Sequence, residues 1–316
     1  MSDQDKPAPA NWERSVLEKL ALSAIQEQRR SRHWSILFKT LGFLYLFIVL
    51  FLAAGWFGSD GVSIKEHTAL VDLQGVIASD QASADSVIAS LQGAFEDKKT
   101  KGVILRINSP GGSPVQAGQI YDEIRRLRAL HPKIPLYAVV DDICASGGYY
   151  VAVGADKIFV DKASIVGSIG VLMDGFGFTQ TMQKLGVERR LLTAGENKGF
   201  LDPFSPVDPK QAAFAKQMLE EIHGQFIGVV REGRGKRLQE TPEMFSGLVW
   251  SGEKSIQLGL ADALGNVESV ARDVIKAEDI VDYTQREGLA ARLASRLGAS
   301  AAKALMPFEQ AGVRLR

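Results

Sequence analysis

The sequence is poor in the residues on which several classes of protein depend. A single cysteine, Cys144, occurs among 316 residues, which excludes an intrachain disulfide and a zinc site built from several cysteines. Lysine plus arginine and aspartate plus glutamate each number 37, so the chain has no excess of positive charge for binding nucleic acid. It also lacks a GxxxxGK[ST] phosphate loop and the spacing of zinc ligands. We therefore expect no metal, no cofactor and no nucleic-acid partner.

Charge is absent from one stretch near the N-terminus. The 18 residues LGFLYLFIVLFLAAGWFG, 41–58, contain no charged side chain, and residues 35–38 extend the apolar character upstream. About 20 apolar residues cross the hydrocarbon core of a bilayer. A cleaved signal peptide begins closer to the first methionine, whereas here about 40 mostly polar residues come first. We interpret residues 36–58 as an uncleaved transmembrane signal anchor; the alternative is a buried core helix.

The charges around this span are distributed unevenly. Residues 20–40 contain four cations, Arg29, Arg30, Arg32 and Lys39, against one acid, Glu27. The twenty residues after the span have no such cationic excess. The positive-inside rule therefore predicts a single-pass protein of the cell (inner) membrane. Its segment 1–35 is expected in the cytoplasm, and the domain 59–280 with a helical tail 281–316 is expected on the extracytoplasmic (periplasmic) side.

Beyond the anchor, short apolar runs alternate with segments of helical periodicity. This alternation predicts parallel βαβ units and hence an α/β fold. The expected strands are 67–77, 102–108, 134–143, 156–160 and 187–194, and the expected helices are 85–97, 116–130 and 147–155. A long helix follows, with Asp208 as N-cap, Pro209 as its first residue and Gly233 at its end.

Four turns rich in small residues carry the candidate chemistry. They are INSPGGS (107–113), CASGGYYVA (144–152), SIVGSIGV (164–171) and TAGENKGFLDPFSP (193–206). Glycine frees backbone N–H groups to bind an oxyanion, and a serine between a strand and a glycine pair is typical of an exposed nucleophile. Each turn also has an ordinary interpretation: Ser146 as a helix N-cap, SPGG as a plain turn, and Lys198 as a solvated loop lysine.

A serine nucleophile needs a base to accept its proton. The chain has four histidines, His33, His67, His131 and His223, so a Ser-His-Asp triad stays open. A lysine base must be neutral, and an unperturbed lysine is neutral in only about one part in 2,500 at pH 7. Lowering its pKa by about 3 units requires roughly 4 kcal/mol, which burial against apolar surface supplies. Phe200, Leu201 and Phe204 follow Lys198 and are candidates for that surface.

Together these motifs resemble the signal peptide peptidase A family, membrane-anchored serine proteases that share the fold of Clp protease and the crotonases. The resemblance narrows the expected α/β fold to the Clp protease and crotonase type. The resemblance runs from about Leu70 to Asn266, including GLVWSGEKSIQLGLADALGNV (247–267), with one copy of the domain instead of two. It implies Ser146 as nucleophile, Lys198 as base, Ser168 as a hydrogen-bond partner of the lysine, and Gly111 or Gly112 with Gly147 as oxyanion donors. The segment after Lys198 departs from the Ser/Thr-rich pattern frequent in that family, which bears on substrate preference.

The resemblance further implies a function. It suggests a Ser-Lys serine endopeptidase that degrades signal peptides remaining in the membrane and other extended apolar peptides. It also implies a homo-oligomer whose sites are shared between neighbours, so Lys198 serves Ser146 of its own or of another chain. The alternatives are a crotonase-like acyl-CoA enzyme, which would not need Lys198, and a non-catalytic membrane scaffold with the same fold.

The predicted orientation has a direct test. A reporter that is active only outside the cytoplasm, fused after Arg316, should be active, because the cationic segment precedes the span. Reporter activity in whole cells measures this outcome. A silent C-terminal fusion together with an active N-terminal fusion would contradict the orientation.

Overall fold

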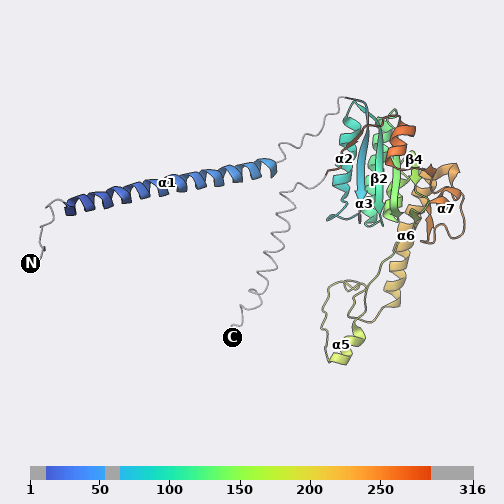
Figure 1. The fold of residues 1–316 in the computed structure, drawn as a ribbon. Helices are drawn as coiled ribbons and strands as arrows, with labels where there is room; N and C mark the ends of the chain where they lie inside the picture. Colours follow the sequence, from blue (N-terminus) through green and yellow to red (C-terminus); the bar gives the residue numbers. More distant parts are fainter. Residues whose placement is uncertain (1–11, 54–64, 286–316) are drawn as a thin grey trace, which may run out of the picture. The chain divides into compact units, whose positions relative to one another are not determined.

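The computed structural model describes residues 12–53 and 65–285 and divides the chain into two units, Met1–Asp60 with Glu287–Arg316 and Gly61–Arg286 (Figure 1). In the first unit, helix α1 covers Trp12–Ala53. Its stretch Glu27–Phe51 has a mean hydropathy of 2.0 and is the one described helix long and apolar enough to cross a membrane. Residues 54–58 of the predicted anchor and the tail from 286 lie outside the described residues, so the orientation stays a prediction.

The second unit is built around a mostly parallel sheet. Within residues 65–285 the sheet has eight strands, with the order β6-β5-β3-β2-β1-β8, and with β4 pairing β3 and β7. Every pair is parallel except β5 with β6. The α/β fold expected from the sequence is therefore present. The strands are β1 His67–Gln74, β2 Thr100–Ser109, β3 Leu136–Ala145, β4 Lys157–Val160, β5 Ile165–Gly167, β6 Val249–Ser251, β7 Ala263–Leu264 and β8 Ile280–Asp282.

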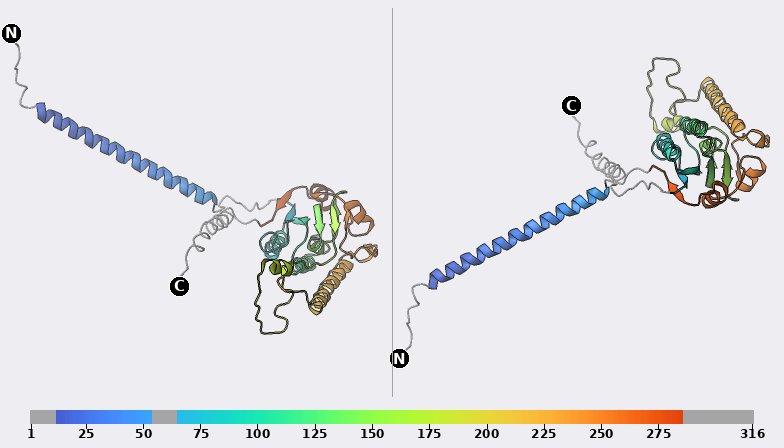
Figure 2. Two further views of the ribbon diagram at one scale, coloured as in Figure 1. Left: turned by 90° about the horizontal axis from the view of Figure 1, so that it is seen from below. Right: turned by 90° about the horizontal axis from the view of Figure 1, so that it is seen from above.

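Helices cover both faces of this sheet (Figure 2). Helices α2, α3, α4 and α6 contribute to the larger hydrophobic core on one face, and α8 with η2 packs on the other. The helices are α2 Ala84–Glu96, α3 Pro114–Leu130, α4 Gly147–Ala152, α5 Thr179–Leu185, α6 Pro209–Arg234, η1 Gly235–Arg237, α7 Gly252–Gln257, α8 Val267–Ser269 and η2 Val270–Ile275.

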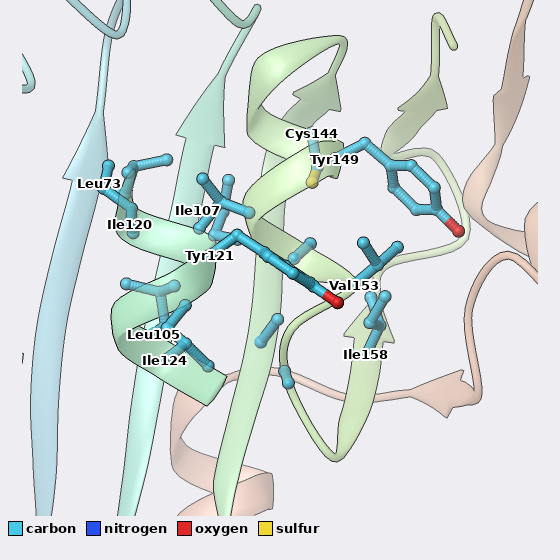
Figure 3. Packing of buried hydrophobic residues seen from close by; sticks show 14 of the residues in the cluster. Leu73, Leu105, Ile107, Ile120, Tyr121, Ile124, Cys144, Tyr149, Val153 and Ile158 are labelled. Atoms are coloured by element: carbon cyan, nitrogen blue, oxygen red, sulfur yellow. The ribbon is translucent and has the colours of Figure 1, made fainter. Parts of the chain in front are cut away.

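The central strands divide their side chains between two cores. In β2, Leu105 and Ile107 belong to the larger core and Ile104 to the smaller one, as the two-residue period of a strand requires. Figure 3 shows Leu105 and Ile107 beside Ile120 and Ile124 of α3. All of these side chains are fully buried. Each such burial contributes about 1.5–3 kcal/mol, which fixes the carboxyl ends of the central strands where the candidate site lies.

Two expectations about secondary structure are wrong. Residues 187–194, expected as a strand, form no strand and are exposed. They belong to the segment 171–208, called here the arm, which projects away from the sheet with α5 near its tip (Figure 1). A strand needs a pairing partner, and the arm lies beyond the reach of the sheet edge. The long helix also continues through Gly233 to Arg234. Gly233 is required there because a Cβ would lie 2.3 Å from the carbonyl oxygen of Val153.

A buried ion pair joins the end of α6 to the chain before β7. Arg234, 1% exposed, donates from Nη1 to Oδ2 of Asp262 at 2.8 Å and from Nε to the carbonyl of Gly259 at 2.7 Å. Asp262 also accepts from the backbone N–H of Ile158 at 2.7 Å. Burial opposes ionisation of Asp262, but the hydrogen bond and charge of Arg234, the hydrogen bond from Ile158 and the charge of Arg237 together outweigh it. The pKa of Asp262 therefore lies below its ordinary value.

We expect Asp262→Asn to lower the free energy of unfolding by about 3–5 kcal/mol, because it leaves the Arg234 charge buried without a counter-ion. Since the folded pKa of Asp262 is depressed, the stabilisation is complete well above the unfolded value of about 3.9 and is lost as pH falls through the lower folded pKa. Urea unfolding of both proteins between pH 7 and pH 3 measures the difference. Asp273→Asn, which alters an exposed ion pair, is the control and should change stability little. Equal stability of the Asp262→Asn and parent proteins at pH 7 would contradict this role.

Candidate active site

Ser146 lies at the junction between β3 and α4 in a strained backbone conformation. Its φ of 51° and ψ of −123° are rare for a residue with a side chain, and such strain costs about 1–3 kcal/mol. The N–H of Ser146 donates to the carbonyl of Gly167 at 2.9 Å, which ties the junction to β5. Although Ser146 occupies the N-cap position of α4, its side chain makes no capping hydrogen bond. The ordinary N-cap interpretation therefore leaves the hydroxyl without a structural role.

The SPGG turn after β2 packs directly against this junction. Gly111 has a φ of 104°, and a Cβ there would lie 2.7 Å from both the Cβ of Ser146 and the nitrogen of Gly147. A Cβ on Gly147 would lie 3.3 Å from the nitrogen of Gly112. The amide of Gly111 donates to Oγ of Ser109 at 3.1 Å, whereas the amides of Gly112 and Gly147 make no hydrogen bond to the described residues. Gly112 and Gly147 are thus the pair of amides left free beside Ser146.

Ser168 also approaches this site through a constrained backbone. It directly follows β5 with a φ of 51°, and its N–H donates to the carbonyl of Leu248 at 2.7 Å. The antiparallel strand β6 holds β5 in place, and the ring of Trp250 covers Gly167 so closely that a Cβ there would meet it at 2.8 Å. The GLVWSG segment therefore fixes the position of Ser168.

One cavity of about 570 Å³ joins three of the four predicted turns. Ser146, Ser168, Gly112 and Gly147 line it together. A volume of this size is typical of a small-molecule or peptide subsite. The rest of its wall is mainly apolar, and sequence reasoning did not assign these residues to the site: Pro114, Tyr150, Val171, Leu172, Ile222 and Phe226. In the sequence, Ile222 and Phe226 show only the four-residue spacing of an apolar helix face, which does not by itself mark a site.

Lys198 is not brought to Ser146 within this chain. It lies on the arm, is exposed, and does not line the 570 Å³ cavity. The apolar residues expected to bury it have other partners: Phe200 packs edge-on against Phe214 with ring centroids 5.8 Å apart, and Phe204 stacks on Phe178 at 5.5 Å. Three of the predicted turns, 107–113, 144–152 and 164–171, therefore line one cavity, and the turn 193–206 with Lys198 does not.

No histidine lines this cavity in the described part of the chain. His223 follows Ile222 of the cavity wall, and its Nε2 lies 3.1 Å from the carbonyl oxygen of Ile169. His67 is buried against Tyr283, and His131 packs on Phe95 at the end of α3. Cys144, two residues before Ser146, is fully buried, and burial raises the pKa of its thiol. These side chains have structural roles that account for their positions.

The sequence matches two family models over this domain. Residues 128–281 match the model of peptidase family S49, and residues 65–165 match that of Clp protease. A Synechocystis protein named as a protease is 32% identical over 65% of the chain and 72% of its own length. The chain belongs to peptidase family S49. The predicted resemblance and the Clp-type fold are thereby confirmed.

Other relatives carry different names. An Enterococcus faecium protein named signal peptide peptidase SppA is 29% identical over 71% of the chain and 67% of its own length. A Brucella melitensis protein named Na(+)/H(+) antiporter NhaA is 46% identical over 190 residues, which are 60% of the chain. The chain spans only 26% of the length of that relative, so its name describes a much longer protein.

The contact between Gly111 and Ser146 generates a test. We expect Gly111→Ala to lower peptide hydrolysis about 100- to 1,000-fold, the usual effect of a lost oxyanion donor. The added methyl group would displace the nucleophile Ser146 and the free amide of Gly147. Steady-state kinetics measure this, and circular dichroism checks the fold. Gly118→Ala, in open space on α3, is the matched control and should retain activity. A folded Gly111→Ala protein with the parent rate would remove this turn from the site.

Proposed function

We propose that the chain is a membrane-anchored serine endopeptidase whose nucleophile is Ser146. The observation that carries this proposal is the position of the Ser146 hydroxyl. A strained backbone holds it in a cavity beside the free amides of Gly112 and Gly147. Membership of peptidase family S49 supports it. An acyl-CoA enzyme or a scaffold would also use the fold, but neither gives a purpose to the strain at Ser146.

The proposed reaction is acyl transfer to serine followed by hydrolysis. Oγ of Ser146 attacks the peptide carbonyl carbon while its proton passes to a base, and the amides of Gly112 and Gly147 stabilise the oxyanion. The intermediate expels the amine, which takes the proton from the base. Water then attacks the acyl-enzyme by the same route and releases the acid.

We propose Lys198 as this base, supplied by a second copy of the chain. The arm that bears Lys198 exposes large apolar side chains that line neither cavity, including Leu185, Val187 and Leu192, and Leu192 is 96% exposed. Exposed apolar surface of this extent is typical of an interface between proteins. Contact with a neighbour would bury the amine and favour its neutral form, with the hydroxyl of Ser168 as hydrogen-bond partner at the cavity.

We infer that the substrates are signal peptides left in the membrane and other extended apolar peptides. The apolar wall formed by Tyr150, Ile222 and Phe226 suits an apolar side chain next to the scissile bond. A membrane anchor keeps such a site near the bilayer, and the Enterococcus faecium relative is named a signal peptide peptidase. The proposed location is the cell membrane, with the N-terminus in the cytoplasm and the domain outside it.

The dyad and its division between chains are tested by complementation. Ser146→Ala and Lys198→Ala should each abolish peptide hydrolysis, and so should Lys198→Arg, because a guanidinium does not release its proton at usable pH. When Ser146→Ala and Lys198→Ala are co-expressed, about one quarter of the sites in a ring of mixed chains should combine an intact serine with an intact lysine. Hydrolysis by the purified mixed oligomer measures this.

Two outcomes would contradict parts of this proposal. Activity of Lys198→Arg near the parent rate would exclude Lys198 as the base. Inactive single variants without recovery in the mixture would place the lysine and serine of each site in one chain. Because the amine must be neutral to accept the proton, the parent rate should also rise toward alkaline pH.

A further inference from the structure

A second cavity lies between the arm and the first half of α6. Its volume is about 900 Å³, larger than the 570 Å³ around Ser146. No group with a part in the proposed acyl transfer lines it. Its wall is largely apolar and includes Phe176, Phe178, Leu191, Leu201, Val207 and Leu219.

One face of α6 lines both cavities. Ala212, Ala215, Lys216 and Leu219 line the second cavity, and Ile222, Gln225 and Phe226 line the first. Successive residues of this set lie one or three positions apart, so they form a single stripe along the helix. The opposite wall is also continuous, since residues 170–172 line the first cavity and residues 173–178 the second. These adjoining linings make the two cavities consecutive parts of one groove along α6. Figure 1 shows that α6 runs outward from the sheet toward the arm.

The length of this groove suits an extended peptide. Ala212 and Phe226 are separated by about 21 Å along the helix axis, at 1.5 Å per residue. An extended chain covers this distance with about six residues at roughly 3.3 Å each. A peptide whose scissile carbonyl lies at Ser146 would therefore reach the far end of the second cavity within about six residues.

The charges in the second cavity favour a cation at that end. Asp202 is engaged by Arg189 and Ser205, and Asp208 accepts the backbone N–H of Lys210 as the N-cap of α6. Asp174 and Glu196 also line the cavity, and their carboxylates have no ion-pair partner among the described residues. Lys216 also lines the cavity, but its Nζ lies 3.9 Å from Oε1 of Glu220 on the same helix. The carboxylates of Asp174 and Glu196 therefore leave negative charge beside the apolar wall, which attracts a basic side chain that follows an apolar segment.

We propose that the second cavity is a distal substrate subsite, which binds the far end of the peptide that is cleaved at Ser146. Its ligand is an extended peptide segment, apolar over about six residues and ending in a lysine or arginine. This subsite rests on the proposed endopeptidase function and specifies its substrate class. It makes the enzyme select long apolar peptides with a basic end over short ones.

The test compares peptides that share the residues around the scissile bond. One has four residues, and two have ten, extended by apolar residues and a terminal lysine on either the amino or the carboxyl side. For the parent, one extended peptide should have a KM about 10-fold or more below that of the short peptide, with similar kcat. Leu219→Ser should raise the KM of that peptide to the value of the short one and leave the short peptide unaffected. Met218→Ser, on the neighbouring position of α6 that lines neither cavity, is the matched control.

The contribution of the two carboxylates is tested separately. The double variant Asp174→Asn with Glu196→Gln should lose the preference for a terminal lysine over a terminal glutamine and keep the dependence on length. Glu221→Gln, on α6 outside both cavities, is the matched control for the loss of a carboxylate.

Binding to the Ser146→Ala protein separates this inference from the proposed activity. Fluorescence anisotropy should show tighter binding of one extended peptide, lost in the Ser146→Ala, Leu219→Ser double variant, whether or not the parent hydrolyses peptides. Equal affinity for short and extended peptides would overturn the subsite. A changed oligomer mass of Leu219→Ser in light scattering, with unchanged peptide affinity, would also overturn it and assign the cavity to a second copy of the chain.

Discussion

The backbone conformation of Ser146 is the constraint on which the rest of the site depends. A positive φ at a residue with a side chain is unfavourable by about 1–3 kcal/mol, so the surroundings must hold it. The carbonyl of Gly167 on β5 accepts the N–H of Ser146, and the Gly111 turn after β2 closes on the other side. The central strand β3 lies between these two neighbours. The sheet therefore determines where the hydroxyl lies and which amides lie beside it.

This arrangement explains why so much of the domain is devoted to a short stretch of chain. The core beneath β2 and β3 fixes the strand ends, and β6 with Trp250 fixes the edge that bears Ser168. The Arg234–Asp262 pair joins the end of α6 to the chain that precedes β7. Because α6 also lines both cavities, the same contacts that stabilise the fold align the groove with Ser146.

Much of the fold and part of the site could be predicted from the sequence. The strands 67–77, 102–108 and 134–143 have patterns that local periodicity reveals, and the glycine turns mark the sheet edge where Ser146 and Ser168 meet. The strand expected at 187–194 was wrong because an apolar run alone does not provide a pairing partner. The position of Lys198 and the groove along α6 depend on how the arm leaves the sheet. No local sequence pattern encodes the course of the arm. In the proposed function, moreover, the lysine of each site comes from a second copy of the chain.

Identification of the residue that reacts as the nucleophile is the most direct test of the central claim. The full-length protein in detergent can be treated with a fluorophosphonate and digested, and the modified peptide sequenced by mass spectrometry. A single adduct on Ser146, absent from the Ser146→Ala protein and prevented by prior unfolding, is the predicted result. An adduct on Ser168 instead, or continued peptide hydrolysis by a protein whose Ser146 is fully modified, would contradict it.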